Sequence, residues 1–190
     1  MLATAQKSAG FTLIEMLITI TIMTLALSLG IPSYRTWVQN TQIRNAAESI
    51  ENGIQRARAE AVKCNTNVAF ILGAATSWKI IYVGACGDVA ASGIPAGTTL
   101  ESRSSGEGSK NATVVVTPLN AATITFSSLG TVVANADASA TLTQVDLNTS
   151  VTDTSASELR TLRVAIGPGG NVRMCDPNLG SSSTDPRRCY

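Results

Sequence analysis

The strongest hydrophobic pattern in the chain is an apolar run close to its start. Residues 11–31 contain a single charged side chain, that of Glu15. As a helix rising about 1.5 Å per residue, a run of this length crosses a hydrocarbon core about 30 Å thick. A carboxylate inside a membrane span costs free energy and usually marks a function. The pattern therefore predicts a membrane-crossing helix in which the glutamate has a functional role.

A helical pattern resumes beyond Pro32. Apolar residues recur at steps of three and four, the spacing of one helix face, at Ile43, Ala47, Ile50, Ile54, Ala57 and Ala61. Polar side chains occupy the other faces: Arg44, Glu48, Glu51, Gln55, Arg58 and Glu60. We predict one helix from Phe11 to Lys63, whose second half packs on a sheet through this stripe. Gly53 should weaken its interior by about 1 kcal/mol relative to alanine.

The remainder of the chain predicts antiparallel strands, which makes the fold class α+β. Alternation and turn residues favour strands at 68–72, 78–83, 113–117, 123–126, 141–147, 159–166 and 171–175. Two tight turns, at 73–76 and 167–170, should close hairpins. Residues 87–111 are rich in glycine, serine and alanine, so we predict mostly loop there.

Four cysteines follow the apolar run: Cys64, Cys86, Cys175 and Cys189. None belongs to a Cys-x-x-Cys pair, and an even number outside the cytoplasm favours two disulfides over a zinc site. Cys64 and Cys86 each lie eleven positions from Ala75, so a hairpin centred there brings them opposite each other at its base. Cys175 and Cys189 would close a loop of about fifteen residues and hold the C-terminal tail.

Composition argues against an enzyme. The 190 residues suit one domain plus an anchor, carry a net charge of +1, and include no histidine, which excludes histidine-dependent catalysis and metal sites. No phosphate-binding loop or Gly-x-Ser-x-Gly elbow is present. Carboxylates are scattered, and we expect Asp146 and Asp153 to be solvated. We predict no catalytic residue, no metal and no cofactor.

Three simple interpretations of the apolar run remain open at this point. A signal peptide would be cut after it, and Ala26-Leu27-Ser28 is an acceptable cleavage site. A plain anchor would not need a glutamate, and a buried core helix is rarely so apolar all round. Lys7 precedes the run and no basic residue follows until Arg35, so the N-terminus should stay cytoplasmic.

The stretch Gly10-Phe-Thr-Leu-Ile-Glu15, after a short basic leader, resembles the processing site of type IV pilins and of the pseudopilins of type II secretion. The resemblance implies the type IV pilin fold and a prepilin peptidase that removes residues 1–10, cutting between Gly10 and Phe11 and methylating Phe11. It also implies a transmembrane or filament-core helix at 11–31, a kink at Pro32, and an amphipathic helix plus periplasmic β-domain at 32–190. The chain would lie in the bacterial inner membrane and then in a pilus or pseudopilus.

Physical chemistry supports a role for Glu15 in such assembly. Cleavage would create a charged amine at Phe11, and a cation buried in a bundle of helices needs an anion. Glu15 of a neighbouring subunit could supply that anion and so set the stagger between subunits. Pairing within one chain is also conceivable, since the two positions lie one helical turn apart.

The C-terminal half is similar to the FimT/GspH group of minor pilins and pseudopilins. The residues that carry this similarity are 124–130 (Ile-Thr-Phe-Ser-Ser-Leu-Gly), the strand 162–166, and 167–176, which begins Gly-Pro-Gly-Gly. It implies a minor pilin that assembles with other pilins, or alternatively a GspH-type pseudopilin of type II secretion.

A DNA-binding receptor at the pilus tip is the alternative from another class. Some FimT-like proteins take up DNA through an arginine-containing tail, which nominates Arg173, Arg187 and Arg188, with Arg160 and Arg163 on the preceding strand. The competing interpretation is an ordinary solvated tail. The segment from Thr161 to Tyr190 contains four arginines and two aspartates, so its net charge is only +2.

Overall fold

The computed structural model describes residues 10–87, 93–149, 159–180 and 182–189, without the side chains of Leu29 and Pro32. The predicted leader, apart from Gly10, and Asp153 therefore lie outside the described residues. One long helix, α1 (Leu13–Lys63), precedes all the strands. These are β1 (Val68–Leu72), β2 (Trp78–Tyr82), β3 (Thr99–Arg103), β4 (Ala112–Thr117), β5 (Thr123–Phe126), β6 (Val132–Val133), β7 (Gln144–Thr149), β8 (Leu162–Ile166) and β9 (Val172–Cys175).

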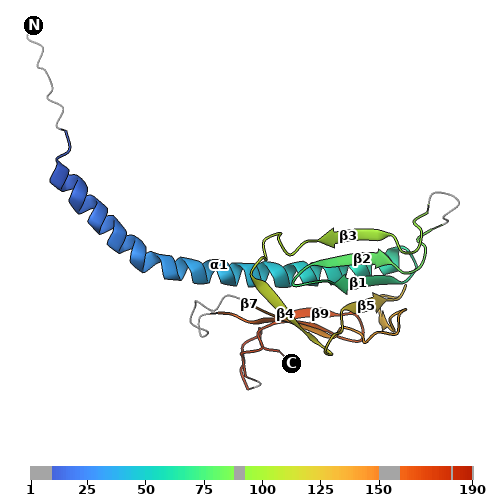
Figure 1. Ribbon diagram of the computed structural model, residues 1–190. Helices are drawn as coiled ribbons and strands as arrows, with labels where there is room; N and C mark the ends of the chain where they lie inside the picture. The colour runs from blue at the N-terminus through green and yellow to red at the C-terminus, as the bar shows by residue number, and fades with distance from the viewer. Residues whose placement is uncertain (1–9, 88–92, 150–158, 181, 190) are drawn as a thin grey trace, which may run out of the picture.

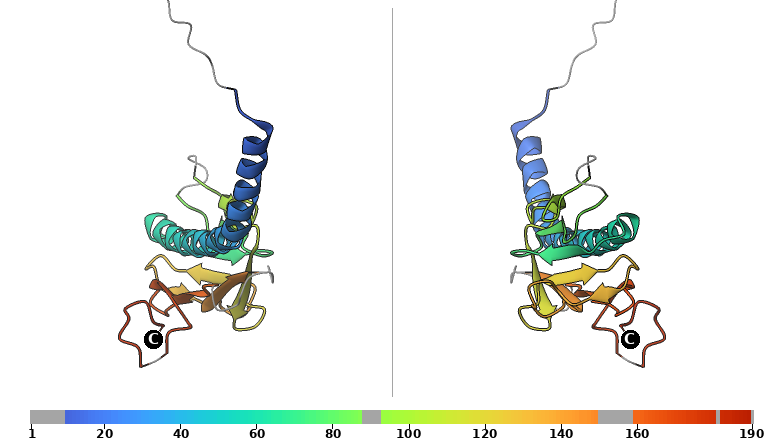
Figure 2. Two further views of the ribbon diagram at one scale, coloured as in Figure 1. Left: turned by 90° about the vertical axis from the view of Figure 1, so that its left-hand side faces the viewer. Right: turned by 90° about the vertical axis from the view of Figure 1, so that its right-hand side faces the viewer.

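Helix α1 has two halves with different surroundings. Its N-terminal half projects away from the rest of the molecule, and its C-terminal half lies along the β-domain (Figure 1). The other two views show the same separation (Figure 2). The predicted helix is confirmed at its C-terminal end and begins two residues later than expected, because Thr12 is its N-cap.

The strands form two antiparallel sheets, one of five strands in the order β3-β2-β1-β5-β6 and one of four in the order β4-β7-β8-β9. The two predicted hairpins are present. In the first, Leu72 pairs with Trp78 across the turn at 73–77, and in the second, Ile166 pairs with Val172 across the glycine-rich turn at 167–171.

The helix and both sheets share one hydrophobic core. All six residues of the predicted stripe have no exposed surface, which confirms the face that α1 packs on the sheets. Their partners come from both sheets and include Phe70, Ile80, Ile124, Phe126, Leu147 and Val164. Gly53 belongs to this interface, because a Cβ there would lie 2.8 Å from Cε2 of Phe70 and 3.2 Å from the indole of Trp78.

Four strands differ from the prediction by more than one residue. Strand β3 lies in the segment predicted as loop; it is an edge strand whose residues are mostly exposed, so it shows no apolar alternation. Strand β6 has two residues and was not predicted. Strand β7 is 144–149 instead of 141–147, since the buried Leu142 precedes the paired residues, and β8 begins at Leu162 instead of Leu159.

Candidate functional site

The exposed half of α1, residues 13–31, is the most apolar surface of the described chain. Large side chains there are open to solvent, among them Leu13 (82% exposed), Ile22 (61%) and Leu25 (67%). An 18-residue window of α1 has a mean hydropathy of 2.0 with none of it buried, so by length and composition this helix could cross a membrane. A surface of this kind requires lipid or other helices to cover it.

The first turn of α1 is closed by a reciprocal pair of hydrogen bonds between Thr12 and Glu15. The backbone N–H of Glu15 donates to Thr12 Oγ1 at 3.3 Å, and the backbone N–H of Thr12 donates to Glu15 Oε2 at 3.1 Å. The Thr12 hydroxyl also donates to Glu15 Oε2, at 3.2 Å. This capping box satisfies two backbone donors that a helix start otherwise leaves unpaired. Glu15 is therefore held at the helix N-terminus, where the helix dipole favours a negative charge.

Gly10 and Phe11 precede this cap in an exposed, non-helical segment. Phe11 is 79% exposed. A Cβ added to Gly10 would meet no atom within 4 Å, so packing in the described structure does not require glycine here.

Helix α1 continues without interruption through Pro32 and curves between its exposed half and its packed half (Figure 1). The curvature changes the direction of the helix before it reaches the β-domain. A kink caused by Pro32 itself stays a prediction.

All four cysteines are paired. Cys64 is bonded to Cys86 and Cys175 to Cys189, the two pairings that the sequence predicts. The first joins the end of α1 to the segment after β2, and the second joins the end of β9 to the tail. Closing loops of this length stabilises a domain by about 3 kcal/mol each in the chain-entropy model.

The three nominated tail arginines take part in the tail's own structure. Arg173 Nη2 donates to the carbonyl oxygens of Pro186 and Arg188, both at 3.0 Å. Arg187 forms an ion pair with Asp185 at 2.7 Å, and the hydrogen bonds from its side chain and backbone lower the pKa of Asp185 to about 2. Arg188 pairs with Asp176 through a backbone bridge beside the disulfide. Arg173 therefore holds the tail against β9.

The two arginines nominated on the preceding strand are separated by the fold. Arg163 forms a two-pronged ion pair with Asp146 of β7, at 2.6 and 3.1 Å. The prediction that Asp146 is solvated was wrong, because strand pairing places it opposite Arg163. Arg160 lies with Arg187 and Trp37 around a groove of about 570 Å³ between α1 and β8–β9.

Comparison with known proteins decides the family. The model of the family described as type II transport protein GspH matches residues 46–170, and that of the prokaryotic N-terminal methylation motif matches residues 5–31. The chain belongs to the GspH family. No curated protein sequence matches it significantly.

Solved structures similar to this GspH-family chain include two crystal forms of the type IV minor pilin FimU from Pseudomonas aeruginosa. Both are 21% identical to it. They cover 77% and 81% of this chain and 99% of the FimU chain, with TM-scores of 0.42 and 0.45.

Family membership establishes the class of function. The GspH-family chain has the pilin architecture, one long N-terminal helix packed on antiparallel sheets, and the role of a minor pilin or pseudopilin. Such proteins are structural subunits. DNA binding by the tail arginines stays a prediction.

One buried carboxylate of this GspH-family chain was not predicted. Glu60 was assigned to a polar face of α1, yet it is only 3% exposed. It accepts a hydrogen bond from Tyr82 Oη at 3.2 Å and forms ion pairs with Lys63 and Arg56 at 3.2 and 3.3 Å. Burial, and then the charge of Glu60, raise the pKa of Tyr82. The basic residues three positions after and four before Glu60 are a sequence signal for such a cluster.

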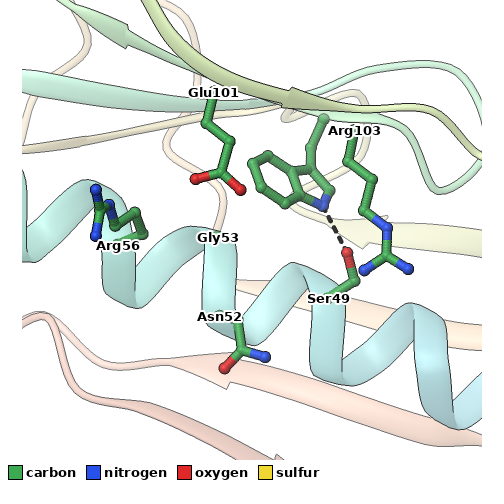
Figure 3. A pocket seen from close by; sticks show the side chains of 7 residues that line it. Ser49, Asn52, Gly53, Arg56, Glu101 and Arg103 are labelled. Carbon is green, nitrogen blue, oxygen red and sulfur yellow. Dashed lines mark hydrogen bonds between the residues drawn. The ribbon is translucent and has the colours of Figure 1, made fainter. Parts of the chain in front are cut away.

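A small cavity of about 350 Å³ lies between α1 and β3 (Figure 3). Trp78 is among the residues that line it, and its indole Nε1 donates to Ser49 Oγ at 2.8 Å. Arg56 and Arg103 lie at its two ends with Glu101 between them (Figure 3). Arg56 is paired with Glu60, and Arg103 is paired with Glu107. Both arginines thus have partners in the domain, and we assign the cavity no ligand.

Proposed function

We propose that this chain is made as a prepilin and becomes a minor subunit of a type IV pilus. The observation that carries the proposal is the exposed apolar half of α1, which no described part of the chain covers. A bilayer would cover it before assembly, and the helices of other pilins would cover it in a filament.

Processing would follow from the segment before the helix. A prepilin peptidase in the inner membrane would cut between Gly10 and Phe11 and methylate the new amine of Phe11. The exposed, non-helical placement of these two residues, and the absence of a packing reason for Gly10, support this role. The N-terminus would stay cytoplasmic and the β-domain periplasmic.

Glu15 would then act as the counter-charge during assembly. The amine of Phe11 exists only after cleavage, and a cation buried among apolar helices is costly unless an anion is close. Glu15 of an adjacent subunit supplies that anion. Docking of the helices is therefore most favourable at the stagger that brings the two charges together.

The second candidate is a pseudopilin of a type II secretion system, favoured by the description of the matching family as a type II transport protein. The two candidates share the helix, the processing and the charge pairing. They differ in the machine that extracts the helix from the membrane. Deletion of the gene separates them: loss of pili with normal protein secretion supports the pilin, and the reverse result supports the pseudopilin.

The shared mechanism is tested by producing the full chain with and without a prepilin peptidase. We expect the peptidase to remove ten residues and leave a methylated Phe11, as read by mass spectrometry. Glu15→Ala should still be cleaved but should be depleted from purified filaments, whereas Glu48→Ala, on an exposed face of the packed half, should be incorporated normally. Normal incorporation of Glu15→Ala would contradict the charge-pairing mechanism.

A further inference from the structure

Two aromatic side chains stand at the end of the apolar run, outside the β-domain core. Tyr34 is 65% exposed and Trp37 is 62% exposed, and their ring centroids lie 5.9 Å apart on one side of α1. Within the described part of the chain, no hydrogen bond is made by Tyr34 Oη or by Trp37 Nε1. Arg35, between them, is also exposed.

This combination has the chemistry of a membrane interface. Tyrosine and tryptophan collect where hydrocarbon meets water, because the ring body is apolar and its single polar atom reaches water or a headgroup. An arginine beside them can place its stem along apolar surface and its guanidinium among phosphates. The exposed rings directly follow the apolar run, which is where the interface of a spanning helix must lie.

The spacing between Tyr34 and Glu15 matches the thickness of a bilayer. Tyr34 lies nineteen positions after Glu15 along continuous helix. At 1.5 Å per residue this is about 28 Å, close to the roughly 30 Å of a hydrocarbon core. If the rings lie at the outer boundary of the hydrocarbon, Glu15 lies at the inner boundary instead of within the apolar layer. The Gly10–Phe11 bond then lies beyond that boundary, among the headgroups of the cytoplasmic leaflet.

We propose that Tyr34, Arg35 and Trp37 form an interfacial anchor that binds the phospholipid headgroup region of the periplasmic leaflet. The anchor fixes the depth of the precursor, so that Glu15 and the cleavage site are presented at the cytoplasmic surface. This inference rests on the proposed function, in which residues 11–31 span the inner membrane. It also explains how a carboxylate is tolerated in the apolar run before assembly.

The depth of Trp37 can be measured directly in the full chain. The chain has two tryptophans, so Trp78→Phe leaves Trp37 as the only indole. In vesicles of phosphatidylethanolamine and phosphatidylglycerol, lipids brominated near the glycerol should quench it several-fold more than lipids brominated at the chain end. The calculated depth should be about 15 Å from the bilayer centre. Because Trp78→Phe alters the core, Trp37→Phe serves as the complement and should abolish the lipid-dependent quenching of the wild-type chain.

Two results of this measurement would overturn the anchor. Quenching by aqueous acrylamide with no effect of brominated lipid would place Trp37 outside the bilayer, available to a neighbouring subunit instead. Strongest quenching by chain-end bromines would place it in the apolar layer. Neither result depends on cleavage or on filaments.

The effect on processing is tested in cells that contain the peptidase. Tyr34→Ser with Trp37→Ser should slow leader cleavage several-fold, because the precursor loses its fixed depth. The exchange Tyr34→Trp with Trp37→Tyr should restore the wild-type rate. Leu129→Ser, at another exposed apolar side chain (83%), should leave the rate unchanged. Wild-type cleavage kinetics in the double serine variant would refute the anchor, whereas an uncleaved wild-type chain would refute the proposed function.

Discussion

The guanidinium Nε of Arg58, on the packed half of α1, donates a 2.8 Å hydrogen bond to the carbonyl oxygen of Gly130 in the turn between β5 and β6. Its Nη2 donates at 3.3 Å to the carbonyl oxygen of Gly169, in the turn between β8 and β9. These turns belong to different sheets and meet directly, since the backbone N–H of Val132 donates to the carbonyl of Pro168 at 3.2 Å. One helical side chain therefore joins the helix to both sheets.

Arg58→Ala should lower the free energy of unfolding by about 1–3 kcal/mol, because both hydrogen bonds it loses are charge-assisted and the one to Gly130 is partly buried. Denaturant unfolding of the full chain in detergent, followed by circular dichroism, measures this change. Gln55→Ala, one turn earlier on an exposed face, is the matched control and should change stability little. Equal effects of the two substitutions would contradict the role of Arg58 as the link between sheets.

Gly53→Ala tests packing against helix propensity. Helix propensity alone predicts that the alanine raises the free energy of unfolding by about 1 kcal/mol. The structure predicts a loss of about 1–3 kcal/mol, because the new Cβ would lie 2.8 Å from the ring of Phe70 and force the core to shift. Gly30→Ala, where a Cβ meets nothing within 4 Å, is the control and should not destabilise. Thermal unfolding measures whether Gly53→Ala raises or lowers stability. A variant more stable than the wild-type chain would show that the helix and sheet pack less closely than described.

The Tyr82–Glu60 hydrogen bond predicts a loss of stability in alkali. The pKa of Tyr82 is raised in the folded chain by burial and by Glu60, so the unfolded chain releases the phenolic proton first, near pH 10. Stability from this group is thus complete below pH 10 and is lost as pH rises toward the folded pKa. Tyr82→Phe should lower stability by about 1 kcal/mol at neutral pH and remove this alkaline component. Tyr34→Phe should keep the alkaline loss, and an unchanged profile in Tyr82→Phe would refute the assignment.

In the C-terminal tail, the titration of the Asp185 carboxyl should depend on Arg187. Hydrogen bonds from the side chain and backbone of Arg187 lower the pKa of Asp185 to about 2. The lowered pKa means that the stabilising contribution is present above the ordinary carboxyl pKa, about 3.9, and is lost as pH falls toward 2. Arg187→Gln should raise the pKa of Asp185 toward its ordinary value, as measured by carboxyl NMR titration. Arg188→Gln should not; an equal rise in both variants would point to general charge effects instead of the specific pair.

Local patterns predicted the elements that repeat over many residues. The helix was predicted to its last residue and the buried stripe in full, because a long apolar face at helical spacing has few alternative structures. Strands β1 and β5 were predicted to the residue, since they combine β-branched side chains with burial. Strand β3 was missed because an exposed edge strand is held by backbone hydrogen bonds to β2, which leave no hydrophobic pattern.

The candidate site divides in the same way. The cysteine pairs were predicted from spacing along the chain and are confirmed, and the roles of Gly10, Phe11 and Glu15, predicted from a short motif, stay predictions. Three contacts join residues that are far apart in the chain. Glu60 accepts a hydrogen bond from Tyr82, 22 positions away, and Arg163 pairs with Asp146, 17 positions away. Arg58 donates to Gly130, 72 positions away. Which residue meets which across such distances depends on strand order and register.

By itself, the sequence of this protein determined an apolar helix long enough to cross a membrane, with a glutamate near its start, an N-terminal methylation motif and a β-domain with paired cysteines. Each of these rests on composition, periodicity or spacing within a short segment. Only the tertiary structure decided that Gly53 is required by the rings above it, that Arg173 holds the tail, and that the aromatic pair after the apolar run stays exposed. These facts depend on which surfaces the core covers, and that is settled only when the helix and both sheets pack together.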